Sequence, residues 1–410
     1  MNKKSVREHD VARKRVIHRV AYDVPLKEVN GKMEVADDAR IKATLPTIKY
    51  LLEQKSKIIL LSWLKRPKGQ IVPEWRMDPV AKRLSEILNK PVKKVDSVVG
   101  KEVDEAVFTL KESEILMLEN VRFHPGEITA DDQFARELAK LGEVKVQDAF
   151  AQVHRVHASI TGIPKYLPTV AGLYLEKEVD ALTPLVTNPA HPFIVIIGGG
   201  KISDKIDAIG NLIKKADYIL VGGGVANTFM KAQGYEIGDS FVEDTFVDEA
   251  KKIKKDFVKF AKELLAKYPS KIILPIDFLS GDSLREARKT KVVKLGKNKI
   301  LVEKPWALLD IGPETIKKYA AFIKSAKTIF WNGPLGMFED ERFARATKIL
   351  AQKVALNRNV TVLGGGDTLA AARKFNLVTS FTHVSLAGGV TLEFLAGKRL
   401  PGIDLILDKD

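Results

Sequence analysis

Residues 193–205 read Phe193-Ile-Val-Ile-Ile-Gly-Gly-Gly-Lys-Ile-Ser-Asp-Lys205, which is an apolar run followed by three glycines and two lysines. The apolar run has the length of a strand and does not alternate with polar residues, so it indicates a strand buried on both faces. Glycine at its end allows the backbone to turn sharply. A buried strand that ends in glycine and leads into a helix-like pattern is typical of a parallel sheet covered by helices.

The same order of features recurs along the chain. We predict an α/β protein with two Rossmann-like, three-layer α/β/α lobes and mainly parallel sheets. The strands predicted in the first half cover 15–21, 57–62, 115–118 and 144–147, and those in the second half cover 193–197, 218–221, 271–275, 307–311, 328–331, 360–363 and 382–385. Ligands of such sheets bind just beyond the carboxyl ends of the strands.

A chain of 410 residues suggests two or three domains. Prolines and glycine break it between 164 and 172, after which Leu175, Val179, Leu182 and Val186 recur at helical spacing. We therefore predict an N-terminal lobe over 1–170, a connecting helix over 171–188 and a C-terminal lobe over 189–390. We expect residues 391–410 to return to the N-terminal lobe.

The composition excludes several classes of protein. The chain has no cysteine, so disulfides and cysteine-based metal sites are excluded. Its apolar runs are far shorter than the roughly 20 residues of a membrane helix, and its charged N-terminus does not read as a signal peptide. We expect a cytoplasmic protein without a membrane or nucleic-acid partner. The net charge of +15 is explained mostly by solvated helix faces, such as residues 251–259, and otherwise by phosphate ligands.

Glycine triplets close three of the predicted strands, at 198–200, 222–224 and 364–366. Glycine lets backbone N–H groups approach a phosphate closely, although a triplet can also be a tight strand-to-helix turn. The Walker A pattern fails because Val195 and Ile202 replace its first glycine and its Ser or Thr. The dinucleotide-binding pattern fails because Ser203 replaces its last glycine. We predict a phosphate site of another type.

Charged residues follow two of these triplets. Lys201 and Lys205 lie four residues apart, which on a helix places both ammonium groups on one face, either around an anion or in solvent. Asp367 and Thr368 follow the third triplet. A carboxylate there suits Mg²⁺ bound with a nucleotide, and it also suits a helix N-cap; the two roles are compatible. In the loop from Trp331 to Glu339, the glutamate can accept hydrogen bonds from ribose hydroxyls.

The first half offers arginines at or just past predicted strand ends, namely Arg40, Arg66, Arg122 and Arg155. The planar guanidinium group matches carboxylate and phosphate with two parallel hydrogen bonds. These arginines suit a substrate that carries both groups, if they converge. His154 and His157 flank Arg155, as structural or catalytic groups.

These segments resemble the phosphoglycerate kinase family over nearly the whole chain. The resemblance rests on ordered motifs: Arg19-Val-Ala-Tyr-Asp-Val-Pro25, Asp38-Ala-Arg-Ile41, Ser62-Trp-Leu-Lys-Arg-Pro67, Leu118-Glu-Asn-Val-Arg-Phe123, Gln147-Asp-Ala-Phe150, His154-Arg-Val-His157, Gly198-Gly-Gly-Lys-Ile-Ser-Asp-Lys205, Trp331-Asn-Gly-Pro334, Gly364-Gly-Gly-Asp-Thr368 and Leu392-Glu-Phe-Leu395.

The resemblance implies a monomeric glycolytic kinase. Its N-terminal lobe would hold 3-phosphoglycerate, its C-terminal lobe would hold Mg-ATP or Mg-ADP, and hinge bending would bring the two together. The implied triose-site residues are Asp23, Arg40, Trp63, Arg66, Arg122 and Arg155. The implied nucleotide-site residues are Gly199, Gly200, Lys201, Lys205, Gly223, Leu309, Asn332, Pro334, Glu339, Gly365, Gly366, Asp367 and Thr368. Arg40 and Lys201 would be catalytic, and Asp367 would carry Mg²⁺.

The chain departs from the family pattern mainly on the triose side. Ala21 and Asp23 replace an Asp and an Asn, Trp63 replaces a His, and Lys65 and Ala151 each replace a Gly. A late Thr-Gly-Gly-Gly loop is Leu386-Ala-Gly-Gly389 here. Three functions remain open at this stage: an active phosphoglycerate kinase with an altered triose site, a kinase for another small carboxylate, and a non-catalytic nucleotide-binding paralogue.

Overall fold

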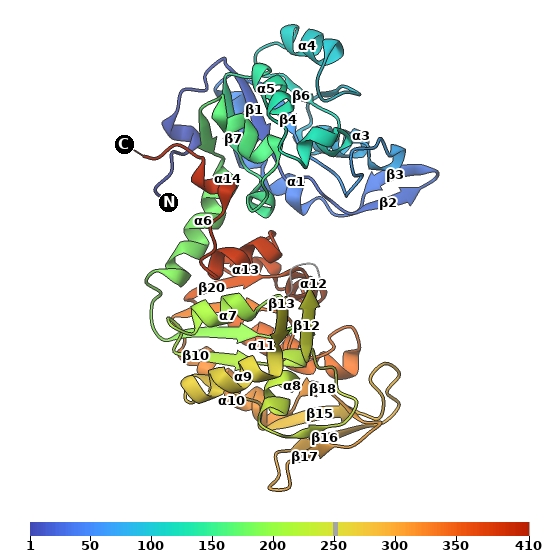
Figure 1. The fold of residues 1–410 in the computed structure, drawn as a ribbon, viewed down its shortest axis with the longest axis vertical. Helices are drawn as coiled ribbons and strands as arrows, with labels where there is room; N and C mark the ends of the chain where they lie inside the picture. The colour runs from blue at the N-terminus through green and yellow to red at the C-terminus, as the bar shows by residue number, and fades with distance from the viewer. Residues whose placement is uncertain (249–252, 410) are drawn as a thin grey trace. The chain divides into compact units, whose positions relative to one another are not determined.

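The computed structural model describes residues 1–248 and 253–409. It divides into two compact units, with unit 1 formed by Met1–Asp180 and Arg399–Asp410 and unit 2 by Ala181–Lys398. Helix α6 (Leu173–Val186) includes the division between the units. The two ends of the chain lie together in unit 1, where Lys3 bridges to Asp408 (Figure 1).

Unit 1 is built on a six-stranded sheet in which every pairing is parallel. In spatial order the strands are β5 (Val92–Lys94), β6 (Ile115–Met117), β4 (Lys57–Leu61), β1 (Arg15–Arg19), β7 (Val144–Gln147) and β8 (Thr169–Ala171). A separate hairpin pairs β2 (Leu26–Val29) with β3 (Lys32–Val35). Its turn residues Asn30 and Gly31 both have positive φ, the geometry that two-residue hairpin turns favour.

The sheet of unit 1 has a hydrophobic core on each face. Along β4, Ile58 and Leu60 belong to one core while Ile59 and Leu61 belong to the other, because successive side chains of a strand point to opposite faces. The first core includes residues of α2 (Leu45–Glu53) and α3 (Asp78–Leu88), and the second includes residues of α4 (Lys101–Phe108) and α5 (Asp132–Lys140). The short helices α1 (Ala39–Ala43) and α14 (Pro401–Asp404) complete the unit.

Unit 2 repeats this plan with a second six-stranded, fully parallel sheet. Its strands in spatial order are β14 (Ile272–Ile273), β10 (Tyr218–Val221), β9 (Phe193–Ile197), β19 (Thr328–Asn332), β20 (Val360–Gly364) and β21 (His383–Val384). Helices α10 (Pro313–Ser325) and α11 (Arg345–Ala355) share a core with Ile194 and Ile196. The remaining helices are α7 (Ile206–Leu212), α8 (Gly223–Ala232), α9 (Phe257–Lys267), α12 (Gly366–Lys374) and α13 (Gly389–Leu395).

Smaller sheets complete unit 2 (Figure 1). Strand β15 (Asp277–Gly281) pairs antiparallel with both β16 (Thr290–Lys294) and β18 (Ala307–Ile311). Strand β11 (Glu236–Ile237) pairs with β17 (Ile300–Val302), and β12 (Thr245–Asp248) pairs with β13 (Ile253–Asp256).

The structure confirms the predicted fold class and each predicted strand, with strand ends within a few residues. The predicted strand at 307–311 is β18, which pairs antiparallel with β15 and lies outside the six-stranded parallel sheet. One detail of the prediction was wrong. Of the basic stretch 251–259, residues 251–252 lie outside the described residues, and 253–256 form a strand before α9 begins at Phe257. In the described part of the chain, no helix has the length and apolarity to cross a membrane.

Candidate active site

Most candidate site residues of unit 2 lie at or just after the carboxyl ends of its parallel strands, whereas Leu309 lies in β18. The glycine triplets follow β9, β10 and β20, and the segment from Trp331 to Glu339 follows β19. In the sheet, β10, β9, β19 and β20 are consecutive neighbours. Because all of these strands are parallel, their loops meet at the carboxyl edge of the sheet, where ligands of such folds bind.

Most of the glycines in these loops are required by close backbone packing. A Cβ on Gly198 would overlap the carbonyl oxygen of Pro334, and one on Gly224 would overlap the carbonyl oxygen of Gly200. In contrast, apart from their chain neighbours and the backbone of their own helices, no atom of the described residues lies within 4 Å of the Cβ positions of Gly366 and Gly389. The explanation given from the sequence was that glycine lets the backbone approach a phosphate, and this fits the loops after β20 and β21. The triplets after β9 and β10 serve chiefly to let neighbouring loops pack closely against one another.

A cavity of 230 Å³ lies at this edge, with mainly apolar side chains around it. Of the nucleotide-site residues predicted from the sequence, it is lined by Gly199, Gly200, Gly223, Leu309, Pro334, Glu339 and Asp367. The prediction missed the lining residues Asn227, Phe241, Leu284, Leu308 and Met337. A mainly apolar cavity that also offers the Glu339 carboxylate has the chemistry to take a purine base and its ribose.

A second cavity, of 370 Å³, is polar and glycine-rich. Its predicted lining residues are Lys205, Asn332, Gly365, Gly366, Asp367 and Thr368, and Gly388 and Gly389 also line it. Asp367 lines both cavities. Thr368 Oγ1 accepts a hydrogen bond from Gly333 N at 2.6 Å, and Asn332 Nδ2 donates to Gly364 O at 3.0 Å. These two side chains thus hold the β19 and β20 loops together, and the second cavity has the chemistry of a phosphate site.

The sequence predicted that the two lysines after the first triplet lie on one face of a helix, and this prediction was wrong. Helix α7 begins only at Ile206, so Lys201 and Lys205 both precede it. Lys205 is buried, and its Nζ donates to Lys201 O at 3.1 Å. Burial lowers the pKa of Lys205, while nearby Asp204 and Asp367 oppose that shift. Lys201 is exposed and lines neither cavity.

Asp367 is the best-placed residue for a metal ion. It is the second residue of α12, it is exposed, and it sits at the junction of the two cavities. Mg²⁺ usually takes only one or two protein carboxylates and completes its shell with water and substrate phosphates. A single carboxylate between an apolar and a phosphate-like cavity therefore fits Mg²⁺ that arrives with a nucleotide.

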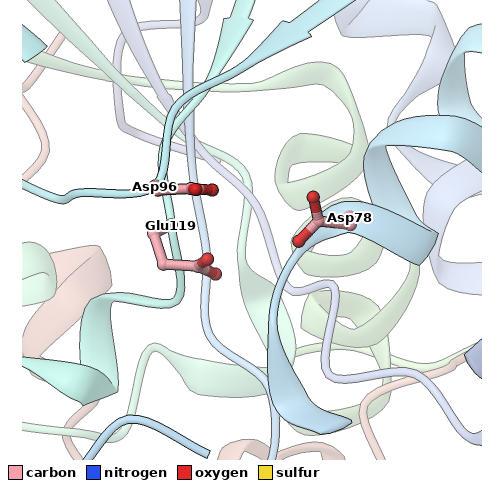
Figure 2. Close-up of side chains that lie close together, drawn as sticks. All are labelled: Asp78, Asp96 and Glu119. Atoms are coloured by element: carbon pink, nitrogen blue, oxygen red, sulfur yellow. The ribbon is translucent and has the colours of Figure 1, made fainter. Parts of the chain in front are cut away.

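A group of three carboxylates in unit 1, formed by Asp78, Asp96 and Glu119, also has the spacing of metal ligands (Figure 2). Lys94 Nζ lies 3.0 Å from Asp78, 2.5 Å from Asp96 and 2.7 Å from Glu119. Arg76 Nη1 lies 3.0 Å from Glu119. These two cations offset two of the three negative charges, and each carboxylate already has a cationic partner, so the group is an ion-pair network of the protein itself.

The arginines of unit 1 also lie in loops at one sheet edge. Four neighbouring strands, β6, β4, β1 and β7, lead at their carboxyl ends into the loops that carry Arg122, Arg66, Asp23 and Arg155. Arg122 is 8% exposed, and its Nη1 donates to Lys65 O at 2.6 Å. Burial lowers the pKa of Arg122, Asp23 opposes the shift, and the positive charges of Arg155 and Arg66 add to it. The structure therefore brings these predicted residues together.

Asp23 connects Arg40 to this cluster. The Arg40 Nη1 atom donates to Asp23 O at 2.5 Å, and Asp23 Oδ1 accepts from Lys65 N at 3.0 Å. Lys65 has a φ of 57°, in the left-handed region where glycine is favoured, which explains why the family pattern has glycine there. The Asp23 carboxylate thus fixes the loop after β4.

Three aromatic side chains, those of Trp63, His157 and His154, lie close to these arginines. Trp63 is 2% exposed, and its ring packs against Arg122. His157 is buried, and its Nδ1 atom lies 3.6 Å from Glu127 Oε1. Burial and the neighbouring Arg155 lower the pKa of His154 to about 4, so it is neutral at physiological pH.

Arg19 was missed by the sequence prediction. It is fully buried, its Nε donates to Ser159 Oγ at 2.9 Å, and Ser159 Oγ in turn donates to Glu127 Oε1 at 2.6 Å. Burial lowers the pKa of Arg19 to about 9, and Glu127 opposes that shift. Arg19 is the last residue of β1, but the predicted strand over 15–21 placed it in the interior of the strand, and Glu127 lies in a short 3₁₀ turn without a motif.

A mainly parallel α/β fold in two units, with a lysine- and aspartate-containing glycine cavity in one and an arginine cluster in the other, is typical of a nucleotide-dependent phosphotransferase that acts on a small anion. The family model "Phosphoglycerate kinase" matches residues 6–398. The chain belongs to the phosphoglycerate kinase family.

Curated relatives and solved structures agree with this family. The chain is 45% identical over 412 residues to the phosphoglycerate kinase of Pelotomaculum thermopropionicum and 46% identical over 409 residues to that of Pseudothermotoga lettingae, with 100% of each chain covered. It is similar to the solved phosphoglycerate kinases of Coxiella burnetii, with 38% identity and a TM-score of 0.85, and of Pyrococcus horikoshii, with 30% identity and a TM-score of 0.82. Both of these comparisons cover 98% of each chain.

Proposed function

We propose that the chain catalyses reversible phosphoryl transfer between 1,3-bisphosphoglycerate with ADP and 3-phosphoglycerate with ATP, the glycolytic reaction of a phosphoglycerate kinase. The observation that carries this proposal is the pairing of an arginine cluster in unit 1 with a lysine- and aspartate-lined cavity in unit 2. Its support from outside is the name that full-length relatives carry.

The triose acid would be held in unit 1 by Arg40, Arg66, Arg122 and Arg155. A guanidinium group binds carboxylate or phosphate through two parallel hydrogen bonds, so several arginines can take both ends of 3-phosphoglycerate. The substitution that most threatens this role is Asp23, whose negative charge would repel the substrate carboxylate. The support here is that Asp23 Oδ1 already accepts a hydrogen bond from Lys65 N and that the charge of Asp23 interacts favourably with Arg122.

The nucleotide would be held in unit 2, with its base and ribose in the apolar cavity and its phosphates in the polar one. The ligands of the base and ribose would be Leu309, Pro334 and Glu339, and those of the phosphates would be Lys205 and the glycine-rich loops, including Gly365 and Gly366. Asp367 would hold Mg²⁺, which when bound neutralises phosphate charge and orients the transferring group.

The chemical step needs charge stabilisation and positioning more than covalent help. We assign Lys201 to the transferring phosphoryl group and Arg40 to the acceptor carboxylate. Lys201 is exposed, so its ammonium group is available to a ligand. Because the phosphoryl group must pass between ligands held in different units, we also propose that hinge bending closes them around the reaction and excludes water.

The loop after β21 bears on whether the chain is active. Its departures from the family pattern are Leu386 and Ala387. Ala387 is 6% exposed, so its methyl group is buried in the protein rather than presented to a ligand. Gly388 and Gly389 line the polar cavity, and apart from adjacent chain no described residue has an atom within 4 Å of their Cβ positions. The loop therefore keeps room for a phosphate, which favours an active kinase over a non-catalytic paralogue.

We propose that the protein is a monomer, because all proposed ligands come from one chain. We also propose that it acts in the cytoplasm, since glycolysis takes place there. The test is release of ADP from Mg-ATP in the presence of 3-phosphoglycerate, with Lys201→Ala as the control variant. Turnover that the control abolishes is the expected result. Folded protein that binds Mg-ATP but gives no ADP with 3-phosphoglycerate refutes the proposal. A panel of other small carboxylates then separates a kinase of different specificity from a non-catalytic paralogue.

A further inference from the structure

Trp63 is placed between the hydrophobic core of unit 1 and the arginine cluster. It follows β4 by two residues and is 2% exposed. Its neighbours in the core include Ile59, Leu61 and Phe134. With so little exposed surface, the indole ring offers almost nothing for a ligand to touch, so any influence on substrate binding must pass through another side chain.

Two guanidinium groups lie against this ring. The Cζ atom of Arg122 is 3.9 Å from the ring centroid of Trp63, and the Cζ atom of Arg19 is 4.4 Å from it. The face of an indole ring is electronegative and attracts a cation within about 6 Å, most strongly where water is excluded. The His157 ring also lies 5.1 Å from the indole ring, tilted by 51°.

Hydrogen bonds alone do not fix the Arg122 guanidinium. Its Nη1 donates to Lys65 O, but its buried Nε finds no partner among the described residues. A planar group held at one corner can rotate about that bond. The Trp63 ring supplies the second contact, and it covers the apolar side of the guanidinium group.

The electrostatics of this region also call for an electronegative group. Arg19 and Arg122 are both buried and repel each other; Asp23 and the buried Glu127 interact favourably with Arg122, and Glu127 does so with Arg19. Lys145, fully buried nearby, adds a further basic group. A protonatable imidazole, as in the family pattern, could add another cation here, whereas the indole ring cannot be protonated and faces both arginines with its electron-rich surface.

We propose that Trp63 is a positioning residue for substrate binding, which holds the Arg122 guanidinium in the orientation that receives the anionic groups of the triose acid. The proposal rests on the proposed function for the identity of that acid. It assigns to Trp63 no contact with substrate, nucleotide or metal. It also gives the Trp at this position a role that a His cannot fill in the same way.

The first test compares two aromatic-to-leucine changes in the same core. Trp63→Leu removes the ring that faces Arg122. Phe134→Leu is the matched control, because Phe134 is 1% exposed in the same core but stacks on His124 at 3.8 Å. We expect Trp63→Leu to raise KM for 3-phosphoglycerate about tenfold while KM for Mg-ATP changes less than twofold, and Phe134→Leu to lower the melting temperature without changing either KM.

The second test keeps an aromatic ring. Trp63→Phe should retain most of the affinity lost in the leucine variant, because a phenyl ring still attracts a cation, although more weakly. In a double-mutant cycle, Trp63→Phe should have no further effect once Arg122→Lys is present, since Trp63 acts only through the guanidinium group. This cycle remains decisive if the leucine variant does not fold. A spectroscopic readout is the change of tryptophan fluorescence on adding 3-phosphoglycerate, which should be lost in Trp63→Phe.

The outcomes separate the two proposals. A wild-type protein without turnover on 3-phosphoglycerate refutes the proposed function, and with it this role toward that acid. If the wild type is active, the proposed function stands, and two results would refute the inference alone. One is an equal KM for 3-phosphoglycerate in Trp63→Leu and Phe134→Leu. The other is additive effects of Trp63→Phe and Arg122→Lys.

Discussion

Lys205 and Lys201 offer a matched pair for testing the phosphate site, because they differ in burial but not in charge or length. Lys205 is buried beside the phosphate-like cavity, and Lys201 is exposed outside it. We predict that Lys205→Met weakens Mg-ADP binding strongly, whereas Lys201→Met leaves Mg-ADP binding within about threefold. Methionine keeps most of the side-chain volume, so each change removes mainly the charge.

In the structure, Lys205 Nζ makes a hydrogen bond to Lys201 O, and its charge interacts with Asp204 and Asp367. The expected magnitude comes from the contact that Lys205 would make with a phosphate of Mg-ADP. A hydrogen bond to a charged partner is worth about 1.5–3 kcal/mol, so losing it converts to roughly a 10- to 150-fold loss of affinity. Because burial disfavours the ammonium group in the free protein, Lys205→Met should leave the melting temperature without nucleotide unchanged or slightly raised.

Isothermal titration calorimetry with Mg-ADP measures this directly, without any contribution from the chemical step. The same variants assayed for turnover should separate further, since Lys201→Met is expected to abolish phosphoryl transfer while it still binds Mg-ADP. Equal affinities of the Lys205→Met and wild-type proteins would refute the assignment of Lys205 to the phosphates. Equal losses in both variants would show a general charge effect rather than a specific contact.

Three further predictions concern stability. Gly198→Ala should destabilise unit 2 by about 3 kcal/mol or more in urea denaturation because its Cβ would overlap a carbonyl oxygen, whereas Gly366→Ala, with open space at that position, should change stability by less than about 1 kcal/mol. The pKa of His154 is about 4 in the folded protein and about 6.5 unfolded, so only the unfolded chain gains this proton between pH 7 and pH 5. Stability should therefore fall as the pH falls, by about 1–2 kcal/mol after allowance for partial exposure, and His154→Gln should lose that part of the pH dependence. Lys94→Ala should lower the free energy of unfolding by about 2–4 kcal/mol, because it leaves the buried Glu119 with one cation fewer. The three carboxylates (Figure 2) could then bind a cation, so about 10 mM Ca²⁺ should raise the melting temperature of the variant but not of the wild type.

The features that the sequence predicted correctly are those that local residue patterns determine. Buried parallel strands need unbroken apolar runs, and β9 and β10 have bounds equal to those predicted because glycine follows directly after each. The strand-end rule then located the loops that carry the arginines and the glycine triplets, since it depends only on strand direction. The same rule could not tell which strands pair, so the antiparallel pairing of the strand at 307–311 with β15 was not predicted.

The features that the sequence missed depend on contacts between distant segments. Helical spacing was read into Lys201 and Lys205, yet the loop after β9 packs against the β19 loop and delays the start of α7. The lining of the 230 Å³ cavity proposed for the nucleotide base includes Phe241 and Leu284, which come from segments without a motif. No local pattern separates such residues from ordinary surface or core positions, because their role is defined only by what the fold places beside them.

The substitutions in the proposed triose site show why a changed residue is better judged by its contacts than by its chemistry alone. Asp23 adds a negative charge to this site, but in the structure its Oδ1 atom accepts a hydrogen bond from the backbone N–H of Lys65. The carbonyl oxygen of Lys65 in turn accepts a hydrogen bond from Arg122 Nη1, and the Trp63 ring packs against the same guanidinium group. These changes at positions 23, 63 and 65 therefore meet at one arginine. Because they form a single connected arrangement, we expect them to be interdependent: reverting Asp23 or Trp63 alone to the family residue should impair the site more than reverting them together, and a double-mutant cycle on KM for 3-phosphoglycerate would measure that coupling.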